Sequence, residues 1–255
     1  MIKIKIENKI CFISIDRPKY LNALNIDVIK ELISVFNRYK NSEEIRSVIL
    51  TGEGDKSFIA GADIKAMSEM SPGEAFDFSK LGNDLTLIMD NYPKPIICAI
   101  NGYALGGGCE LAMACHIRIG SKNALFGQPE SGLGLIPGFG GTQRLPRIVG
   151  LSNAYEILLS GISINADKAK EIGLVSNIFD SQDLMAEAIN IADRINSKSP
   201  YSSKVIIQLV NKGIHLNMKD ALSLESEYFE KIFKHQNKNI GISAFIEKKP
   251  PIFED

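Results

Sequence analysis

Segments with strand periodicity alternate with segments of helix periodicity along most of the chain, and this alternation limits the possible folds most strongly. Apolar residues occupy every second position in Ile2–Glu7 and Ile10–Asp16, which predicts two strands joined as a hairpin. Asn25 precedes a helical three-to-four spacing of apolar residues, whereas Ser47–Thr51 and Ile96–Ile100 are short apolar runs typical of buried strands. Strands that alternate with helices predict an α/β core.

The second half of the chain contains fewer strand patterns. Gly127–Gly141 holds six glycines and two prolines, which predicts a long loop without regular structure, and such loops are usually functional. Beyond this loop the pattern is mostly helical, with one predicted strand at Leu174–Ile178. We therefore divide the chain into a core of residues 1–182 and a helical C-terminal module of residues 183–255.

Charge and hydropathy argue against nucleic-acid and membrane partners. The chain has 29 Lys and Arg against 30 Asp and Glu, and a net charge of −1 provides no strongly basic field for nucleic acid. The longest uncharged stretch, Pro95–Cys109, is too short and too rich in glycine to cross a bilayer. The N-terminal strand pattern is not that of a signal peptide, and the four cysteines form no CxxC pair. These features predict a cytoplasmic protein with reduced thiols.

The known cofactor and metal motifs are incomplete in this sequence. Gly106–Leu111 follows a predicted strand, but Leu111 stands where a dinucleotide fingerprint needs its third glycine. Asp55 likewise stands where a phosphate-binding loop needs its last glycine. The three histidines lie far apart, without the spacing of metal ligands. No metal site and no nucleotide cofactor are predicted.

Two glycine-rich segments are candidates for binding through the backbone. Phe58–Ile64 consists largely of small residues just before a predicted helix, and Asn101–Leu111 leads three successive glycines into another helix. One free N–H group from each segment would stabilise an oxyanion that develops on a carbonyl oxygen. The alternative is that these glycines only allow tight turns and close packing.

Two glutamates are candidates for proton transfer. Glu110 lies in the first turn of the predicted helix, where a carboxylate also compensates the helix dipole. Glu130 lies in the long loop, where the alternative is a solvated surface acid. If both carboxyls face one pocket, burial and mutual repulsion separate their pKa values, and the pair serves as acid and base.

The order of these motifs resembles the enoyl-CoA hydratase/isomerase (crotonase) family, and in particular bacterial members that act on short acyl chains. The resemblance covers essentially the whole chain and rests on Arg17–Asn25, Phe58–Ile64, Asn101–Ala112, Phe126–Glu130, Pro137–Leu145 and Ala244–Pro250. It implies an α/β spiral of repeated ββα units with a helical C-terminal trimerisation module. It also implies a homotrimer, or a homohexamer made of two trimers.

The resemblance assigns roles to individual residues. Ala62 and Gly107 would supply the two N–H groups that hold the thioester oxygen, and Glu110 and Glu130 would be the catalytic carboxyls. Residues near the substrate or its coenzyme A moiety would be Ala23, Ala60, Gly61, Asp63, Ile64, Lys65, Gly106, Gly108, Phe245 and Lys248. The last two, in the C-terminal tail, often reach the coenzyme A from a neighbouring subunit in this family.

The activity implied by the resemblance is reversible syn hydration of a short trans-2-enoyl-CoA, such as crotonyl-CoA, to a 3-hydroxyacyl-CoA. Such an enzyme would serve fatty-acid metabolism, either fatty-acid breakdown or a butyrate-type fermentation, and would need no cofactor. Two alternatives remain open: another acyl-CoA reaction of the superfamily, such as enoyl-CoA isomerisation, and a non-catalytic acyl-CoA-binding protein. Met67, Met70, Phe76 and Phe78 are bulky enough to close an acyl pocket, although at least two of them are expected in the ordinary core.

One position departs from the family pattern. His116 follows the predicted catalytic helix where family members usually have aspartate. The position does not correspond to a catalytic residue. We therefore expect the histidine to change local polar contacts and not the chemistry.

Overall fold

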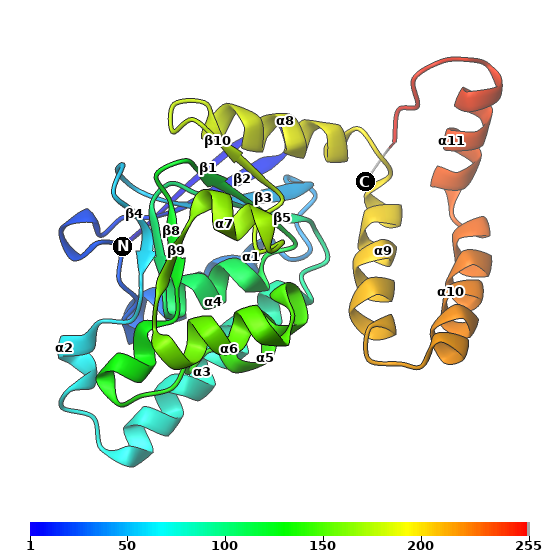
Figure 1. The fold of residues 1–255 in the computed structure, drawn as a ribbon. Coiled ribbons are helices and arrows are strands. Elements are labelled where there is room, and N and C mark those ends of the chain that lie inside the picture. Colours follow the sequence, from blue (N-terminus) through cyan, green and yellow to red (C-terminus); the bar gives the residue numbers. More distant parts are fainter. Residues whose placement is uncertain (254–255) are drawn as a thin grey trace.

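The computed structural model describes residues 1–253, and in this part of the chain the strands form two sheets (Figure 1). The six-stranded sheet contains, in spatial order, β1 (Ile2–Glu7), β2 (Ile10–Ile15), β3 (Ser47–Gly52), β5 (Ile96–Ile100), β7 (Ile117–Ser121) and β10 (Asn177–Phe179). The four-stranded sheet contains β4 (Ser57–Ala60), β6 (Tyr103–Leu105), β8 (Leu125–Gly127) and β9 (Ser163–Asn165).

Helices connect these strands and form the C-terminal part of the described chain. The first group is η1 (Pro18–Tyr20), α1 (Ile26–Tyr39), α2 (Ile64–Met67), α3 (Pro72–Asp90), α4 (Gly107–Ala114), η2 (Pro129–Leu133), α5 (Gly141–Val149), α6 (Leu151–Ser160) and α7 (Ala166–Glu171). The second group is α8 (Leu184–Asn196), α9 (Pro200–Gly213), α10 (Met218–Phe233) and α11 (Gln236–Ile246). No helix within residues 1–253 is both long and apolar enough to cross a membrane.

The N-terminal hairpin and the first helix form as their sequence predicts. β1 and β2 pair antiparallel with Ile2 opposite Ile15, and the turn residues Asn8 and Lys9 take φ angles of 50° and 62°. Positive φ at both turn residues matches the right-handed twist of a hairpin. The Asn25 side chain accepts a hydrogen bond from the first turn of α1 and caps that helix. The predicted α/β core is confirmed.

A repeated strand–strand–helix unit places the ends of the small sheet together. β3 and β4, β5 and β6, and β7 and β8 each contribute one strand to each sheet before the chain enters helices. β4, β6 and β8 run parallel, with Ala60, Leu105 and Gly127 in register at their carboxyl ends. The segments that follow these three residues therefore leave from one edge of the sheet, the usual place for a ligand in α/β folds.

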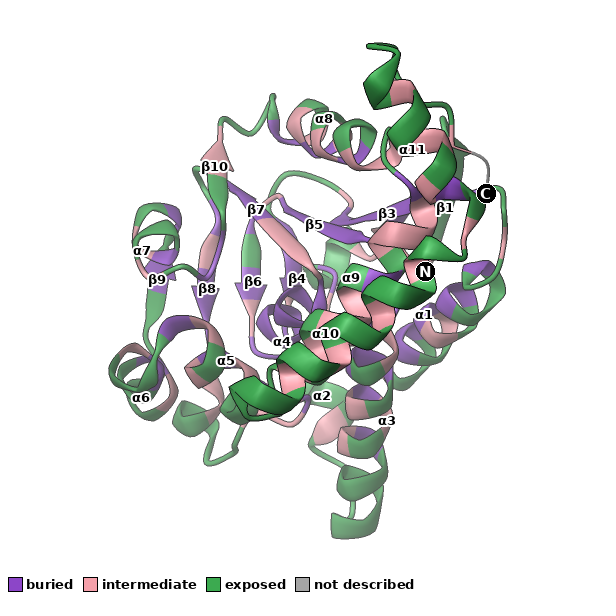
Figure 2. Cartoon of the chain, turned by 90° about the vertical axis from the view of Figure 1, so that its right-hand side faces the viewer, coloured by how far each residue is buried: buried purple, intermediate pink, exposed green. Residues whose placement is uncertain are grey.

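The helices after residue 182 differ in how they contact the sheets. Leu184, Ala188 and Ala192 of α8 are buried against apolar residues of the six-stranded sheet, among them Ile49 and Ile97. In contrast, α9, α10 and α11 extend away from the sheets (Figure 1), and their surfaces are largely exposed or half-buried (Figure 2). The predicted boundary between residues 182 and 183 stays a prediction.

Three local predictions differ from the structure. The strand predicted at Leu174–Ile178 is wrong at its start, because the N–H groups of Leu174 and Val175 both donate to Ala169 and close the end of α7. The loop Gly127–Gly141 is not irregular throughout, since it contains the last residue of β8 and the 3-10 helix η2. The short strands β4, β6 and β9 were not predicted.

Candidate active site

A cavity of about 500 Å³ opens where β4 and β6 end. The backbone of residues 60–62 at the end of β4 and of residues 105–107 at the end of β6 forms one wall of this cavity, and residues of η2 and α3 form other walls. Its lining residues are Ala60, Gly61, Ala62, Ile64, Met67, Pro72, Ala75, Phe76, Phe78, Ser79, Leu105, Gly106, Gly107, Glu110, Pro129, Glu130, Leu133, Leu135, Ile136, Pro137, Gly138 and Phe139. Eight of the predicted site residues are in this set, including both glutamates.

Two backbone N–H groups stand at the cavity wall. Leu24 donates to Gly61 at 2.9 Å and accepts from Asp63 at 2.8 Å, which fixes the backbone on both sides of Ala62. Gly107 is the first residue of α4, where a helix leaves its N–H groups without acceptors in a preceding turn. These are the two residues predicted to bind a thioester oxygen.

Glu110 is a buried carboxyl held by a helix N-terminus. Its side chain is 1% exposed, and its Oε1 atom accepts hydrogen bonds from the N–H groups of Phe139 at 2.8 Å and Gly141 at 2.6 Å. Burial raises the pKa of Glu110 to about 7. The Gly141 N–H opposes this rise in pKa, the charge of Glu130 adds to it, and the Phe139 N–H and Arg144 also oppose it. Glu110 is therefore poised to exchange a proton near neutral pH.

Glu130 reaches the same cavity from the first turn of η2. Its Oε1 atom lies 2.6 Å from the position that a Cβ atom would take on Gly106, beside the start of α4. Burial raises the pKa of Glu130, and its own backbone N–H opposes that shift. The fully buried amide of Gln128 lies beside Glu130, and in the orientation that places its nitrogen on the Glu130 side it would donate to both carboxyl oxygens, at 3.2 and 3.1 Å. The sequence does not predict a role for Gln128, because an amide inside a loop motif carries no chemical signal by itself.

One side of the cavity is apolar and contains residues predicted to close an acyl pocket. Met67 and Phe78 line it, and Phe76, which is 69% exposed, stands at its rim. Met70 does not line this cavity and packs against the hydrophobic core instead. Phe78 packs edge-on against Phe139 with their ring centroids 5.2 Å apart, and it is both a core residue and a wall of the cavity.

Four predicted binding residues lie beside the cavity but not in its lining. The Asp63 side chain caps α2 and pairs with Arg17 at 3.5 Å, and Ala23 precedes the residue that bridges to Ala62. Lys65 is exposed on α2. Gly108 packs against β4, where an added Cβ would lie 2.0 Å from the carbonyl oxygen of Ile59.

The two predicted tail residues lie away from the cavity of their own chain. Phe245 is 85% exposed on α11, and Lys248 follows that helix. Figure 1 shows α11 on the opposite side of the molecule from α2, which lines the cavity. Neither residue can serve this cavity within one described chain.

His116 also lies outside the cavity. Its Nδ1 atom accepts a hydrogen bond from the Ile96 N–H at 2.9 Å, and its Nε2 atom lies 3.2 Å from the Asp90 carbonyl oxygen. Burial lowers the pKa of His116 to about 4. The neutral ring thus joins the start of β5 to the end of α3.

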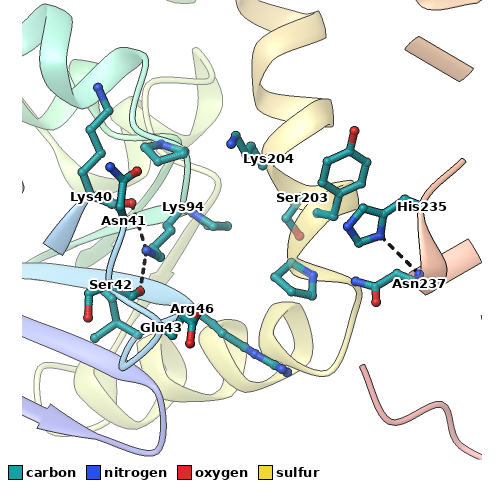
Figure 3. Close-up of a pocket in the computed structure, with 15 residues that line it drawn as sticks. Lys40, Asn41, Ser42, Glu43, Arg46, Lys94, Ser203, Lys204, His235 and Asn237 are labelled. Carbon is teal, nitrogen blue, oxygen red and sulfur yellow. Dashed lines mark hydrogen bonds between the residues drawn. The ribbon is translucent and has the colours of Figure 1, made fainter. Parts of the chain in front are cut away.

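A second cleft of about 270 Å³ lies between the loop after α1 and the first turns of α9 and α11 (Figure 3). Lys94 bridges the loop by donating to the carbonyl oxygens of Tyr39 at 3.1 Å and Ser42 at 2.8 Å. Tyr201 stacks on His235 at 3.9 Å on the opposite wall. None of the predicted site residues lines this cleft.

Comparison with known proteins identifies the family. The model of the enoyl-CoA hydratase/isomerase family matches residues 5–255. This chain belongs to that family. The short-chain-enoyl-CoA hydratase of Clostridium acetobutylicum is 47% identical over 243 residues, which cover 95% of this chain and 93% of the relative. The crotonyl-CoA hydratase of Syntrophomonas wolfei is 43% identical over 97% of this chain and 95% of the relative.

Solved structures of the enoyl-CoA hydratase/isomerase family share the architecture. A crystal structure of an enoyl-CoA hydratase from Bacillus anthracis superposes with a TM-score of 0.96 at 34% identity and covers 99% of this chain and 98% of that one. An enoyl-CoA hydratase from Polaromonas gives a TM-score of 0.95 at 30% identity, with 99% of each chain covered. The predicted crotonase-like fold is therefore confirmed.

Proposed function

We propose that this protein is an enoyl-CoA hydratase, a hydro-lyase that reversibly adds water to short trans-2-enoyl-CoA thioesters such as crotonyl-CoA. The observation that carries the proposal is one cavity lined by two carboxyls of raised pKa and by Ala62 and Gly107, the two residues whose N–H groups are candidates for the oxyanion hole. Two relatives at 47% and 43% identity, named for short-chain and crotonyl-CoA hydration, support it.

The proposed reaction begins with polarisation of the thioester. The N–H groups of Ala62 and Gly107 would bind the carbonyl oxygen, and the N-terminus of α4 would favour the negative charge that develops there. C3 thereby becomes electrophilic. Water forms a bond to C3, the electrons of the double bond move toward C2, and the negative charge is delocalised onto the thioester oxygen.

The two glutamates would transfer the protons. Glu110, whose ionised form accepts two N–H groups, takes a proton from the attacking water, and Glu130 delivers a proton to C2. Both carboxyls line the same cavity, which supports addition of the hydroxyl group to C3 and of the proton to C2 on one face of the double bond. The charge of Glu130 raises the pKa of Glu110, so the two carboxyls titrate as a coupled pair. Hydration changes no oxidation state overall, so the proposed chemistry calls for no redox cofactor.

The assay that tests this function follows the ultraviolet absorbance of the enoyl thioester after protein meets crotonyl-CoA. We expect rapid loss of absorbance and formation of 3-hydroxybutyryl-CoA. If crotonyl-CoA and longer enoyl-CoAs remain unchanged while a 3-enoyl-CoA is converted, the isomerase alternative would replace this proposal. The presence of two glutamates weighs against that alternative, because isomerisation needs only one carboxyl to move a proton.

The pH dependence of hydration provides a separate test. Because the pKa of Glu110 is raised to about 7 and the base must be ionised, kcat/KM is expected to fall as pH decreases through about 7. Measurement of kcat/KM for crotonyl-CoA between about pH 5 and about pH 9 gives this limb. A flat profile across this range would contradict the assignment of Glu110 as base.

We also propose that the chain assembles as a homotrimer or as a hexamer of two trimers. Ile206 and Val210 of α9 and its C-cap residue Ile214 repeat every fourth residue and are more than half exposed. A continuous row of exposed apolar side chains is typical of a surface that another protein surface covers. Phe245 and Lys248 would approach the coenzyme A of a neighbouring subunit, since they lie far from their own cavity.

We also propose that the protein resides in the cytoplasm. The four buried, reduced cysteines support this location.

Sedimentation tests the proposed assembly. At micromolar concentration the mass should be three or six times the 28.0 kDa of the chain. A Val210→Asp variant should dissociate, because it places a charge within the row of exposed apolar side chains. A stable wild-type monomer would contradict the assembly without contradicting the cavity chemistry.

A further inference from the structure

A single peptide group joins α3 to Glu110. The carbonyl oxygen of Gly138 accepts hydrogen bonds from Ser79 Oγ at 2.6 Å and Asn83 Nδ2 at 3.1 Å. The N–H of the same peptide group, which belongs to Phe139, donates to Glu110 Oε1 at 2.8 Å. Because a trans peptide is planar, its oxygen and its N–H point in opposite directions. A rotation that releases α3 therefore also turns the N–H away from Glu110.

The next residues prevent this segment from sliding along α3. The Phe139 ring fills the space over Gly82, where an added Cβ would lie 2.1 Å from a ring carbon. The Phe139 carbonyl accepts from Arg144 Nη1 at 3.1 Å and from Thr86 Oγ1 at 3.4 Å. These contacts fix the position of the Gly138–Phe139 peptide along α3. The hydrogen bonds from Ser79 and Asn83 to the Gly138 carbonyl oxygen then set the direction in which the peptide group points.

We propose that Ser79 and Asn83 are positioning residues for Glu110 and act on it through the Gly138–Phe139 peptide. Hydrogen bonds that run in series through one peptide group polarise one another, so donation to the carbonyl oxygen strengthens donation by the N–H. A stronger N–H bond favours the ionised form of Glu110. This inference rests on the proposed function only for its effect on turnover.

Besides its N–H donors Phe139 and Gly141, Glu110 interacts with titratable or charged groups from three elements. Glu130 of η2 raises the pKa of Glu110, and Arg144 of α5 lowers it. Cys109 of α4, whose pKa is raised to about 12 by burial, is uncharged at neutral pH. Neither Ser79 nor Asn83 forms a hydrogen bond with any of these groups among the described residues. A change in the Glu110 pKa after substitution on α3 would therefore report the peptide link.

The test replaces Asn83 with leucine, which keeps the size of the side chain and removes the donor. Asn83 does not line the cavity, so KM should stay within about twofold, while the low-pH limb of kcat should move upward by about one pH unit. Turnover at pH 7 should fall roughly fivefold to tenfold with that shift. Ser79→Ala should move the low-pH limb of kcat in the same direction; Ser79 lines the cavity, so only its pH profile, and not its KM, tests the link.

Asn91→Ala is the matched control. It removes an asparagine hydrogen bond at the end of the same helix, from Asn91 Nδ2 to the Leu87 carbonyl oxygen at 3.0 Å. Among the described residues, Asn91 forms no hydrogen bond with residues 138–141. This variant should keep the wild-type pH profile. If Asn83→Leu and Ser79→Ala lower the melting temperature but leave the pH limb unchanged, their role is structural and the proposal is wrong.

A direct titration separates this proposal from the proposed function. Infrared difference spectra of the carboxyl band, assigned by its loss in Glu110→Gln, give the Glu110 pKa without substrate. An upward shift of that pKa in Asn83→Leu or Ser79→Ala supports the link even if no enoyl-CoA is hydrated. An unchanged band in an active protein overturns the link and leaves the hydratase function standing.

Discussion

A Glu130→Gln variant is expected to fold normally and to hydrate crotonyl-CoA about 10²–10⁴-fold more slowly than the wild type. Glutamine keeps the size of the side chain, and Glu130 is only half-buried at the cavity wall, so the free energy of unfolding should change little. The amide cannot deliver a proton to C2 of the substrate. The loss should therefore appear in kcat, measured from the thioester absorbance at saturating crotonyl-CoA.

The variant Glu110→Gln separates the two proposed roles. It should also lose hydration, since it removes the base that takes the proton from water. If Glu130 alone delivers and removes the proton at C2, Glu110→Gln should still exchange that proton of a saturated acyl-CoA with solvent deuterium. Near-normal hydration by Glu130→Gln would exclude Glu130 as the acid, whatever its position in the cavity.

The sequence predicts the larger elements of this fold because each contains its own local signal. The hairpin around Asn8 and the helix capped by Asn25 depend on turn and cap residues that act over a few positions. In contrast, β4, β6 and β9 have only three or four residues each, and a strand of that length is defined by its partners in the sheet. Leu174 and Val175 have a strand-like composition but are buried in a turn after α7.

The candidate site shows the same difference between local sequence signals and contacts made over long range. Motif resemblance led to Glu110 and Glu130, although only the register of the small sheet shows that they share one cavity. The residues that support Glu110 were not predicted. Ser79 and Asn83 lie on α3, almost sixty residues before the peptide that they hold, and serine or asparagine on a helix surface has no distinctive pattern. Contacts of this range are set by packing between elements.

Gly108→Ala is expected to have the second large effect, because it forces two elements of the oxyanion site apart. An added Cβ would lie 2.0 Å from the Ile59 carbonyl oxygen and 2.7 Å from the Ile59 Cβ, so α4 must move away from β4. Overpacking of this kind costs about 1–3 kcal/mol in the free energy of unfolding. The shift should also misalign the N–H of Gly107 with that of Ala62, and loss of one such donor elsewhere costs about 2.7–4 kcal/mol of transition-state stabilisation.

Urea unfolding and crotonyl-CoA kinetics measure the two consequences of Gly108→Ala separately. Gly73→Ala is the matched control, since Gly73 lies in α3 with no atom within 4 Å of its added Cβ. That variant should be as stable as the wild type and fully active. If Gly108→Ala is as stable and as active as the wild type, α4 moves relative to β4 without cost in free energy. In that case a rigid alignment of Ala62 and Gly107 is not the source of thioester polarisation. If Gly108→Ala is destabilised but retains full turnover, Gly108 only allows α4 to pack against β4 and does not position the oxyanion donors.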